Sequence, residues 1–415
     1  MLENLQAALM QAGHNFMAHY WLYLSMPVIA AIIGYVTKIA AIRMMFQPLE
    51  FVGIKPWLGW QGVIPRKAEK MASIAVDVIT SRLITVQEIF ARLDPEQIAL
   101  QIEKPMLGAV EQITREVLAQ HRPGMWELMP NFVRDRMMRR VQAEAPQVVA
   151  EVMKDLRNNI SQVFDLKHMV ITALLQDKHL LNRVFSEVGR KEFKFFGYSG
   201  LVFGFIIGLL QMVVWLFYQS PWILPAFGLF IGFASDWLAL QMLFNPKEPV
   251  KILGLTYQGL FLRRQQEVSR DYARLVSDQI ITPANIWHSV LQGPGSDRLF
   301  TLVQRHVEQM VDEQAGLARP LVAFAIGSRQ YQDMKKSVTQ KLVQTLPETL
   351  KHVENYAEGA MNVRNTLMER MQRLTPIEFE GMLRPAFKED EWSLISVGAV
   401  LGFLVGELQT YLLLH

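Results

Sequence analysis

The chain contains no cysteine among its 415 residues, which excludes disulfide bridges and thiolate metal sites. It also lacks a strong excess of charge of either sign. The net charge is +3, which gives no reason to expect a nucleic-acid partner. Charged residues make up 20% of the chain and hydrophobic residues 51%, and the mean hydropathy is +0.14. This composition is too apolar for an ordinary soluble protein and indicates membrane-spanning segments.

Enzyme signatures are absent as well. The sequence has no phosphate-binding Gly-rich loop, no His-Glu-x-x-His and no Gly-x-Ser-x-Gly. Its nine histidines are scattered, and no two of them have convincing metal-ligand spacing. The segment Met1–Met17 lacks the basic start and the cleavage site of a secretory signal peptide. We therefore expect no catalytic residue, no metal, no cofactor and no removed leader.

Four long apolar runs are present, at roughly 20–42, 197–218, 221–244 and 393–414. Each approaches the ~20 residues that a helix needs to cross the hydrocarbon layer of a bilayer. The second and third runs are separated by the short link Gln219-Ser220-Pro221, as in a helical hairpin. Four spans would place both termini and this link on one side of the membrane. The two long polar segments would lie on the other side.

Basic residues predict which side is which. Lys and Arg flank the ends of the spans that face the polar segments, and the opposite side has neither. Examples are Arg43, Arg66 and Lys67 after the first span and Lys194 before the second. The positive-inside rule then places the polar segments in the cytoplasm and the termini outside.

The sequence also repeats itself at an offset of 198 residues. Gly34–Pro48 recurs as Gly232–Pro246, with Gly, Ala, Phe and Pro in register. The spacing Gly200-x3-Gly204-x3-Gly208-x2-Gln211 recurs as Gly398-x3-Gly402-x3-Gly406-x2-Gln409. A repeat of this length indicates a duplicated domain, with each copy reading span, domain, span. An even number of spans gives both copies the same orientation, so the pseudo-two-fold axis would run along the membrane normal.

Both polar segments have apolar residues every three to four positions, as amphipathic helices do, for example at 137–163 and 338–361. Capping residues predict helix starts at Pro95, Pro283, Thr345 and Pro376. We therefore predict an all-α membrane protein with two helical-bundle or coiled-coil domains. Its parts are 1–46, 47–196 (helical domain), 197–218, 221–244, 245–392 (helical domain) and 393–415. The apolar stripes fit packing of helix on helix, and the alternative is a groove that holds lipid.

Lys38 and Asp236 occupy equivalent positions of the repeat and carry opposite charges. An unpaired charge at this depth costs about 2–3 kcal/mol or more, so pairing is the cheaper state. The pair is then either a structural salt bridge or a polar, ion-handling site between the two halves.

Two further residue sets accompany the repeat. Small-residue faces let helices approach closely, or could form a gate or a lipid slot. They comprise Gly200, Gly204, Gly208, Gly398, Gly402 and Gly406. Two loops after the membrane could cradle an anionic headgroup with backbone N–H groups and cations, or could be structural turns. They comprise Gln61, Gly62, Arg66, Lys67, Gln258, Gly259, Arg263 and Arg264.

These motifs resemble a known family. Gly-x-x-Thr-x-x-x-Ala-Ile-x-Met-x-Phe-x-Pro from Gly34 to Pro48, followed by Trp-Gln-Gly-Val-Ile-Pro-Arg-Lys from Trp60, is similar to the bacterial membrane family called domain of unknown function 445. The resemblance covers nearly the whole chain and implies an inner-membrane protein of unknown biochemical role. Members commonly have Asn after the Thr, where this chain has Lys38 and, in the second copy, Asp236.

Two functions compete. The first is an inner-membrane scaffold whose helical domains recruit protein partners or self-associate. The alternative is a lipid-handling or transport protein that uses the pseudo-two-fold interface or the apolar helix faces, with membrane lipids as partners. An intramembrane enzyme ranks last. A scaffold predicts helices closed on one another, whereas lipid handling predicts an apolar groove.

Overall fold

The computed structural model describes residue 10 and residues 13–14, 16–17, 20–54, 58–121, 123–252, 254–315, 328–384 and 391–414. The chain divides into two compact units. The first unit comprises 1–75, 174–272 and 368–415, and the second comprises 76–173 and 273–367. This division differs from one domain per polar segment, because both polar segments contribute helices to the same second unit.

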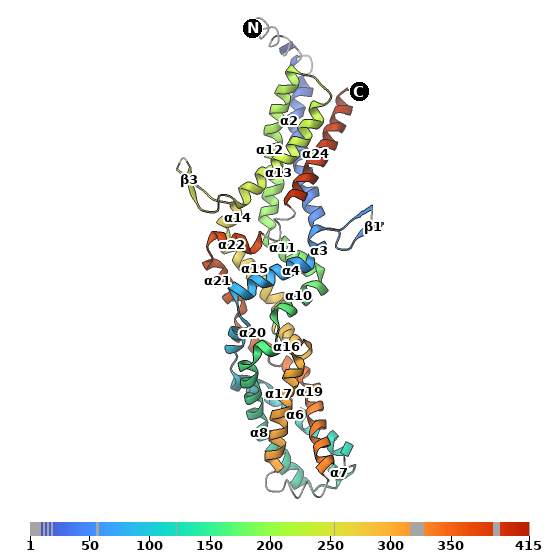
Figure 1. Ribbon diagram of the computed structural model, residues 1–415, viewed down its shortest axis with the longest axis vertical. Coiled ribbons are helices and arrows are strands. Elements are labelled where there is room, and N and C mark those ends of the chain that lie inside the picture. The colour runs from blue at the N-terminus through green and yellow to red at the C-terminus, as the bar shows by residue number, and fades with distance from the viewer. Residues whose placement is uncertain are drawn as a thin grey trace. The chain divides into compact units, whose positions relative to one another are not determined.

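Four long helices dominate the first unit and lie side by side (Figure 1). They are α2 (Tyr20–Phe46), α12 (Arg190–Phe217), α13 (Ile223–Phe244) and α24 (Glu391–Leu414). Among the described residues, α2, α12 and α13 are long and apolar enough to cross a bilayer. The apolar stretch of α24, Ile395–Tyr411, is shorter. On α12, Val202, Ile206 and Leu210 are more than half exposed, which a lipid-facing helix surface explains.

Close backbone approach joins these helices in pairs. A Cβ on Gly200 of α12 would overlap the carbonyl oxygen of Gly34 in α2, and one on Gly232 of α13 would overlap the carbonyl oxygen of Gly398 in α24. Each contact therefore needs glycine, as small-residue faces of membrane helices do. The two contacts are separated by the same 198 residues as the sequence repeat.

Each of α2 and α13 leads into a small hairpin. Strands β1 (Val52–Ile54) and β2 (Leu58–Trp60) pair antiparallel, as do β3 (Val250–Ile252) and β4 (Leu255–Tyr257). We did not predict these strands, because three residues are too few for an alternating pattern to be visible. The other helices that begin in the first unit are α3 (Val63–Arg66), α4 (Ala68–Val78), α11 (Lys178–Val188), α14 (Leu260–Arg263), α15 (Gln265–Gln279) and α22 (Pro376–Leu383).

All regular secondary structure among the described residues of the second unit is helical. It contains η1 (Ile79–Leu83, a π-helical turn), α5 (Val86–Ala91), α6 (Pro95–His121), α7 (Met125–Leu128), α8 (Asn131–Asn158), α9 (Ile160–Val163) and α10 (Leu166–Gln176). From the second polar segment it contains α16 (Pro283–Gln292), α17 (Ser296–Ala315), α19 (Ser328–Lys351), α20 (Glu354–Met361) and the start of α21 (Val363–Arg373). One part of its core forms where Phe90 meets Phe164 and Trp287, with ring centroids 5.9 and 6.0 Å apart. Helices from the two polar segments thus bury their apolar stripes against each other.

Three of the four predicted helix starts are confirmed. Pro95, Pro283 and Pro376 begin α6, α16 and α22. The predicted start at Thr345 is wrong, because this residue lies inside α19. Its hydroxyl donates to the carbonyl of Lys341, 2.9 Å away, one turn back in the same helix. A mid-helix threonine of this kind imitates a cap in the sequence.

Candidate functional site

A polar centre lies inside the four-helix bundle of the first unit. It comprises Lys38 of α2, Ser199 of α12 and Asp236 of α13. Lys38 Nζ lies 3.6 Å from Asp236 Oδ1, and the two side chains are 0% and 1% exposed. Nζ also donates hydrogen bonds to Ser199 Oγ at 2.7 Å and to the carbonyl of Ser235 at 3.0 Å. The structure therefore brings the two charges of the repeat together.

Lys38 and Asp236 differ in the number of contacts that each side chain makes. Besides its hydrogen bonds, Lys38 Nζ lies 4.5 Å from the ring centroid of Phe196 and 5.8 Å from that of Phe203. Neither carboxylate oxygen of Asp236 has a hydrogen-bond partner among the described residues. A Cβ on Gly398 would overlap Asp236 Oδ2, so α24 needs glycine there to admit the carboxylate. Lys38 is thus the main stabilising partner of Asp236.

A small apolar cavity of about 70 Å³ borders the polar centre. Phe196 lines this cavity and also lies against Lys38, and Met45, Leu243 and Phe261 complete much of the wall. Glu192 and Glu391 also border the cavity, but its wall is apolar throughout the described residues. The cavity is far smaller than the ~300–1,000 Å³ of small-molecule sites. The geometry favours a structural ion pair, and an ion-handling role stays a prediction.

The six predicted packing glycines all lie at helix contacts. Gly204 and Gly208 of α12 face Ala30 and Pro27 of α2, and Gly402 and Gly406 of α24 face Gly228 and Pro225 of α13. In each case an added Cβ would come within about 3 Å of the opposite backbone. The faces are therefore occupied by the partner helix and leave no space for a lipid slot.

The two predicted headgroup loops direct their donors inward. The backbone N–H of Gly62 donates to the carbonyl of Pro48 at 2.9 Å, and that of Gly259 donates to Pro246 at 3.0 Å. The side-chain amides of Gln61 and Gln258 donate to nearby carbonyls, those of Leu49 and Lys247, at 2.8 and 3.1 Å. These donors close the loops on themselves, as structural turns do, and the headgroup role stays a prediction.

The cations of these loops differ from one another. Arg66 and Arg263 are exposed, and Lys67 is half-buried. Arg264 is engaged with Glu192 and with Glu267, whose Oε2 lies 2.9 Å from Arg264 Nε. Hydrogen bonds from Arg264 and from Lys191 lower the pKa of Glu267 to about 2. Arg264 therefore serves an ion-pair network within the first unit.

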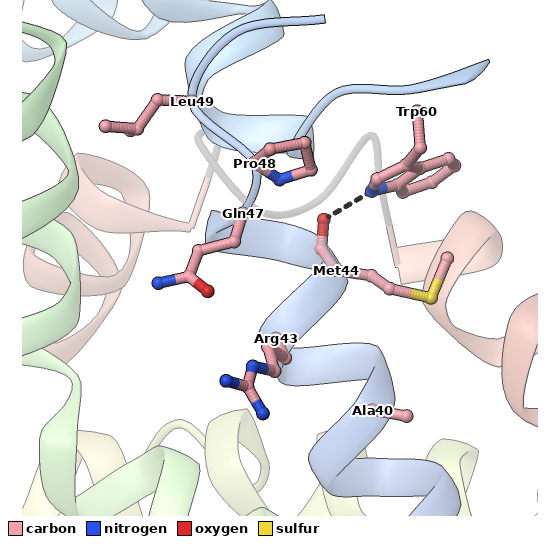
Figure 2. A pocket seen from close by; sticks show the side chains of 7 residues that line it. All are labelled: Ala40, Arg43, Met44, Gln47, Pro48, Leu49 and Trp60. Carbon is pink, nitrogen blue, oxygen red and sulfur yellow. Dashed lines mark hydrogen bonds between the residues drawn. The ribbon is translucent and has the colours of Figure 1, made fainter. Parts of the chain in front are cut away.

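A surface depression of about 660 Å³ lies beside the first of these loops. Figure 2 shows Arg43 in the last turn of α2 and Gln47 just after the helix, with the indole of Trp60 across from them. Trp60 Nε1 donates to the carbonyl of Met44 at 3.1 Å, which fixes the ring. An exposed arginine and a fixed tryptophan at the end of a spanning helix are typical of the membrane–water interface.

The second unit contains an apolar pocket of about 540 Å³, here called the bundle pocket. It lies between α6, α8, α17 and α19. Its lining comprises Val110, Ile113, Thr114, Val117, Leu118, Phe132, Val133, Arg136, Met137, Arg140, Val141, Val307, Met310, Val311, Tyr331, Met334, Val338 and Leu342. Two of its four helices come from each polar segment. The volume falls within the range of small-molecule binding sites.

Polar contacts between charged and histidine side chains link the helices around the bundle pocket. Lys335 of α19 is 4% exposed and lies 3.1 Å from Asp312 of α17. Lys341 of α19 pairs with Glu116 of α6. His306 of α17 lies 2.9 Å from Asp155 of α8. These contacts connect three pairs of the helices that line the pocket.

The sequence alone indicated part of the apolar lining of the bundle pocket. The apolar periodicity of 137–163 and 338–361 includes Met137, Val141, Val338 and Leu342 of the lining. The contributions of α6 and α17 were missed, because a cavity depends on which helices pack together. Among the described residues, no group of three or more His, Asp or Glu side chains is placed to hold a metal ion.

Comparison with known proteins gives relatives along the whole chain, although no family model matches it. A UPF0754 membrane protein of Nostoc punctiforme is 24% identical over 430 aligned residues, covering 95% of this chain and 98% of the relative. One from Picosynechococcus is 21% identical over 434, covering 95% and 99%. One from Staphylococcus aureus is 33% identical over 101, covering 23% and 26%. The number 445 stays a prediction, whereas these matches confirm the resemblance to a bacterial membrane-protein family of unknown role, the UPF0754 membrane proteins.

Proposed function

We propose that this protein is a membrane-anchored lipid-handling protein. In this proposal the helices α2, α12, α13 and α24 anchor the chain, and the bundle pocket of the second unit takes up an acyl chain. The observation that carries the proposal is the pocket of about 540 Å³, lined by apolar side chains from four helices. Burial of hydrocarbon against this apolar lining is favoured by the hydrophobic effect.

The volume of the bundle pocket suits one chain. If a methylene group takes about the ~30 Å³ of a water molecule in the liquid, the pocket holds roughly 18 carbons. Roughly 18 carbons correspond to a single acyl chain, so we propose a ligand with one chain. A protein that extracts or senses one chain beside a membrane fits this size.

The anchor is proposed to span the inner membrane four times, in two copies of one ancestral unit. A 24-residue α24 is about 36 Å long, which exceeds the ~30 Å hydrocarbon layer. The glycine contacts of α2 with α12 and of α13 with α24 recur at the repeat offset, which supports duplication. Lys and Arg on one side of the spans support a cytoplasmic second unit and external termini.

This topology has a simple test because the chain has no cysteine of its own. A membrane-impermeant maleimide applied to intact cells should label Ser220→Cys in the α12–α13 link. It should leave Glu358→Cys in the second unit unlabelled until the cells are opened. The reverse labelling pattern would overturn the proposed orientation.

A scaffold role was the first expectation from the sequence, and it stays a prediction. It requires helices closed on one another, and the bundle pocket favours the lipid alternative instead. We also propose that the protein is not an enzyme. Buried groups such as Lys38 and Asp236 are engaged with each other, and the polar residues of the bundle pocket are few.

The proposal is tested by the lipid that copurifies with the full chain. Met334 of α19 lines the bundle pocket, so Met334→Trp would fill it. Gln340→Trp places the same ring on the exposed side of the same helix and serves as the control. Lipid extraction and mass spectrometry should find a single-chain lipid with the wild type and with Gln340→Trp, and much less with Met334→Trp. Equal lipid content in all three proteins would overturn the proposed function.

A further inference from the structure

Among its described lining residues, the bundle pocket has charged side chains on one helix only. Its lining on α8 comprises Phe132, Val133, Arg136, Met137, Arg140 and Val141. The residues 133, 136, 137, 140 and 141 follow a spacing of three and four, so they share one face of the helix. Two arginines therefore lie one turn apart among apolar residues that line the pocket. No aspartate or glutamate accompanies them among the described lining residues.

Burial differs between the two ends of the bundle pocket. Ile113, Val117 and Val307 are buried and form an apolar floor. Phe132, Arg136 and Arg140 are exposed and form the mouth. A ligand that fits this gradient has a hydrocarbon end inside and a polar end beside the arginines.

The remaining polar groups of the lining are already satisfied. Thr114 Oγ1 donates to the carbonyl of Val110 at 2.7 Å, and Tyr331 Oη donates to Asp312 at 3.0 Å. Arg140 Nε lies 4.0 Å from Glu144, at the limit of an ion pair. Arg136 makes no hydrogen bond or ion pair with any residue that the structure describes. In the described lining, the hydrogen-bond donors that remain available to a ligand are therefore those of the two guanidinium groups.

We propose that the bundle pocket binds a fatty acid, with its carboxylate between Arg136 and Arg140 and its acyl chain among Ile113, Val117 and Val307. The guanidinium groups present forked donors that match the two oxygens of a carboxylate. Their aliphatic stems cover the apolar rim of the mouth. This assignment rests on the proposed lipid-handling function and adds the charge and the polar group of the ligand.

The test uses the full chain in lipid nanodiscs and two photoactivatable probes with the same chain. One probe is a diazirine-bearing palmitate and the other is the corresponding neutral hexadecanol. Cross-linked peptides are identified by mass spectrometry, so that probe dissolved in the bilayer is not counted. Competition by unlabelled palmitate or hexadecanol gives the relative affinities.

The wild type should cross-link palmitate within α6, α17 or α19 and prefer it to hexadecanol by roughly 10-fold or more, as expected for a charge-assisted contact. The double variant Arg136→Gln with Arg140→Gln should bind both probes equally. Arg139→Gln removes an exposed cation of the same helix outside the pocket lining, and it should keep the wild-type preference.

The outcomes separate the two levels of the proposal. Equal binding of palmitate and hexadecanol by the wild type, unchanged in the double variant, overturns the fatty-acid assignment while lipid handling stands. Cross-links of both probes that are absent from the second unit, or that persist unchanged in Met334→Trp, overturn lipid handling as well. Because Arg136 and Arg140 are exposed, their replacement should leave the helical circular dichroism unchanged.

Discussion

The buried pair Lys38–Asp236 allows a quantitative prediction of stability. Lys38→Met keeps an unbranched chain but removes the cation, and it leaves the Asp236 carboxylate buried with no hydrogen bond. Asp236→Asn keeps the shape of the side chain and removes the anion. Lys38 then retains its bonds to Ser199 and to the Ser235 carbonyl. We therefore expect Lys38→Met to destabilise the four-helix bundle of the first unit more than Asp236→Asn does.

The magnitude follows from the geometry of the pair. Unit charges 3.6 Å apart attract by roughly 4–5 kcal/mol at an effective dielectric constant of about 20. Breaking a buried pair by removing one partner costs about 3–5 kcal/mol, whereas replacing both charges can be nearly neutral. Lys38→Met should therefore lose about 3–5 kcal/mol of unfolding free energy. The double variant should lose less than Lys38→Met alone.

The assay is equilibrium unfolding in mixed detergent micelles, followed by helical circular dichroism for the four members of the cycle. Arg43→Met is the control, because it removes an exposed cation from the same helix and should change stability by no more than about 0.5 kcal/mol. Additive losses in the double variant would refute the reasoning, since additivity means that the two charges do not interact.

Two further predictions concern packing and pH. Gly34→Ala should destabilise the four-helix bundle of the first unit by about 1–3 kcal/mol, because its Cβ would overlap the carbonyl of Gly200. The control Gly359→Ala adds a methyl group in open space on α20 and should be neutral or slightly stabilising. Equal effects of the two changes on thermal unfolding would contradict the close approach of α2 and α12. Glu267→Gln should lower the free energy of unfolding at neutral pH. The difference from the wild type should shrink as the pH falls from 4.5 towards about 2, because a carboxylate with a lowered folded-state pKa stabilises the fold until it takes up a proton. A difference that stays constant through this range would show that the ion pairs of Glu267 do not stabilise the fold.

Local sequence patterns predicted the elements that depend on nearby residues. Long apolar runs predicted α2, α12, α13 and α24, and Thr-Pro pairs predicted the starts of α16 and α22. The repeat predicted that Lys38 and Asp236 occupy equivalent places, which the structure brings to 3.6 Å. The helix predictions worked because an apolar run and a helix cap are each specified within one continuous stretch of chain.

Lys38 and Asp236 are far apart in the chain, but other contacts between distant residues were not predictable. The sequence places Arg264 beside a turn, but its partner Glu192 lies 72 positions earlier in the chain. The bundle pocket arises because α6 and α8 pack with α17 and α19, and no pattern within one polar segment specifies that choice. Thr345 shows the opposite error, since a local cap signal was overruled by the continuing helix α19.

The central claim, that the bundle pocket holds an acyl chain, is tested most directly by protection of a single cysteine. The natural chain has none, so Val338→Cys places one thiol in the pocket lining and Gln340→Cys places one on the exposed face of the same helix. The rate of alkylation by N-ethylmaleimide is measured on the full chain with and without palmitate. Palmitate should slow alkylation of Val338→Cys several-fold and leave Gln340→Cys unchanged. Equal rates with and without palmitate at position 338 would contradict the account.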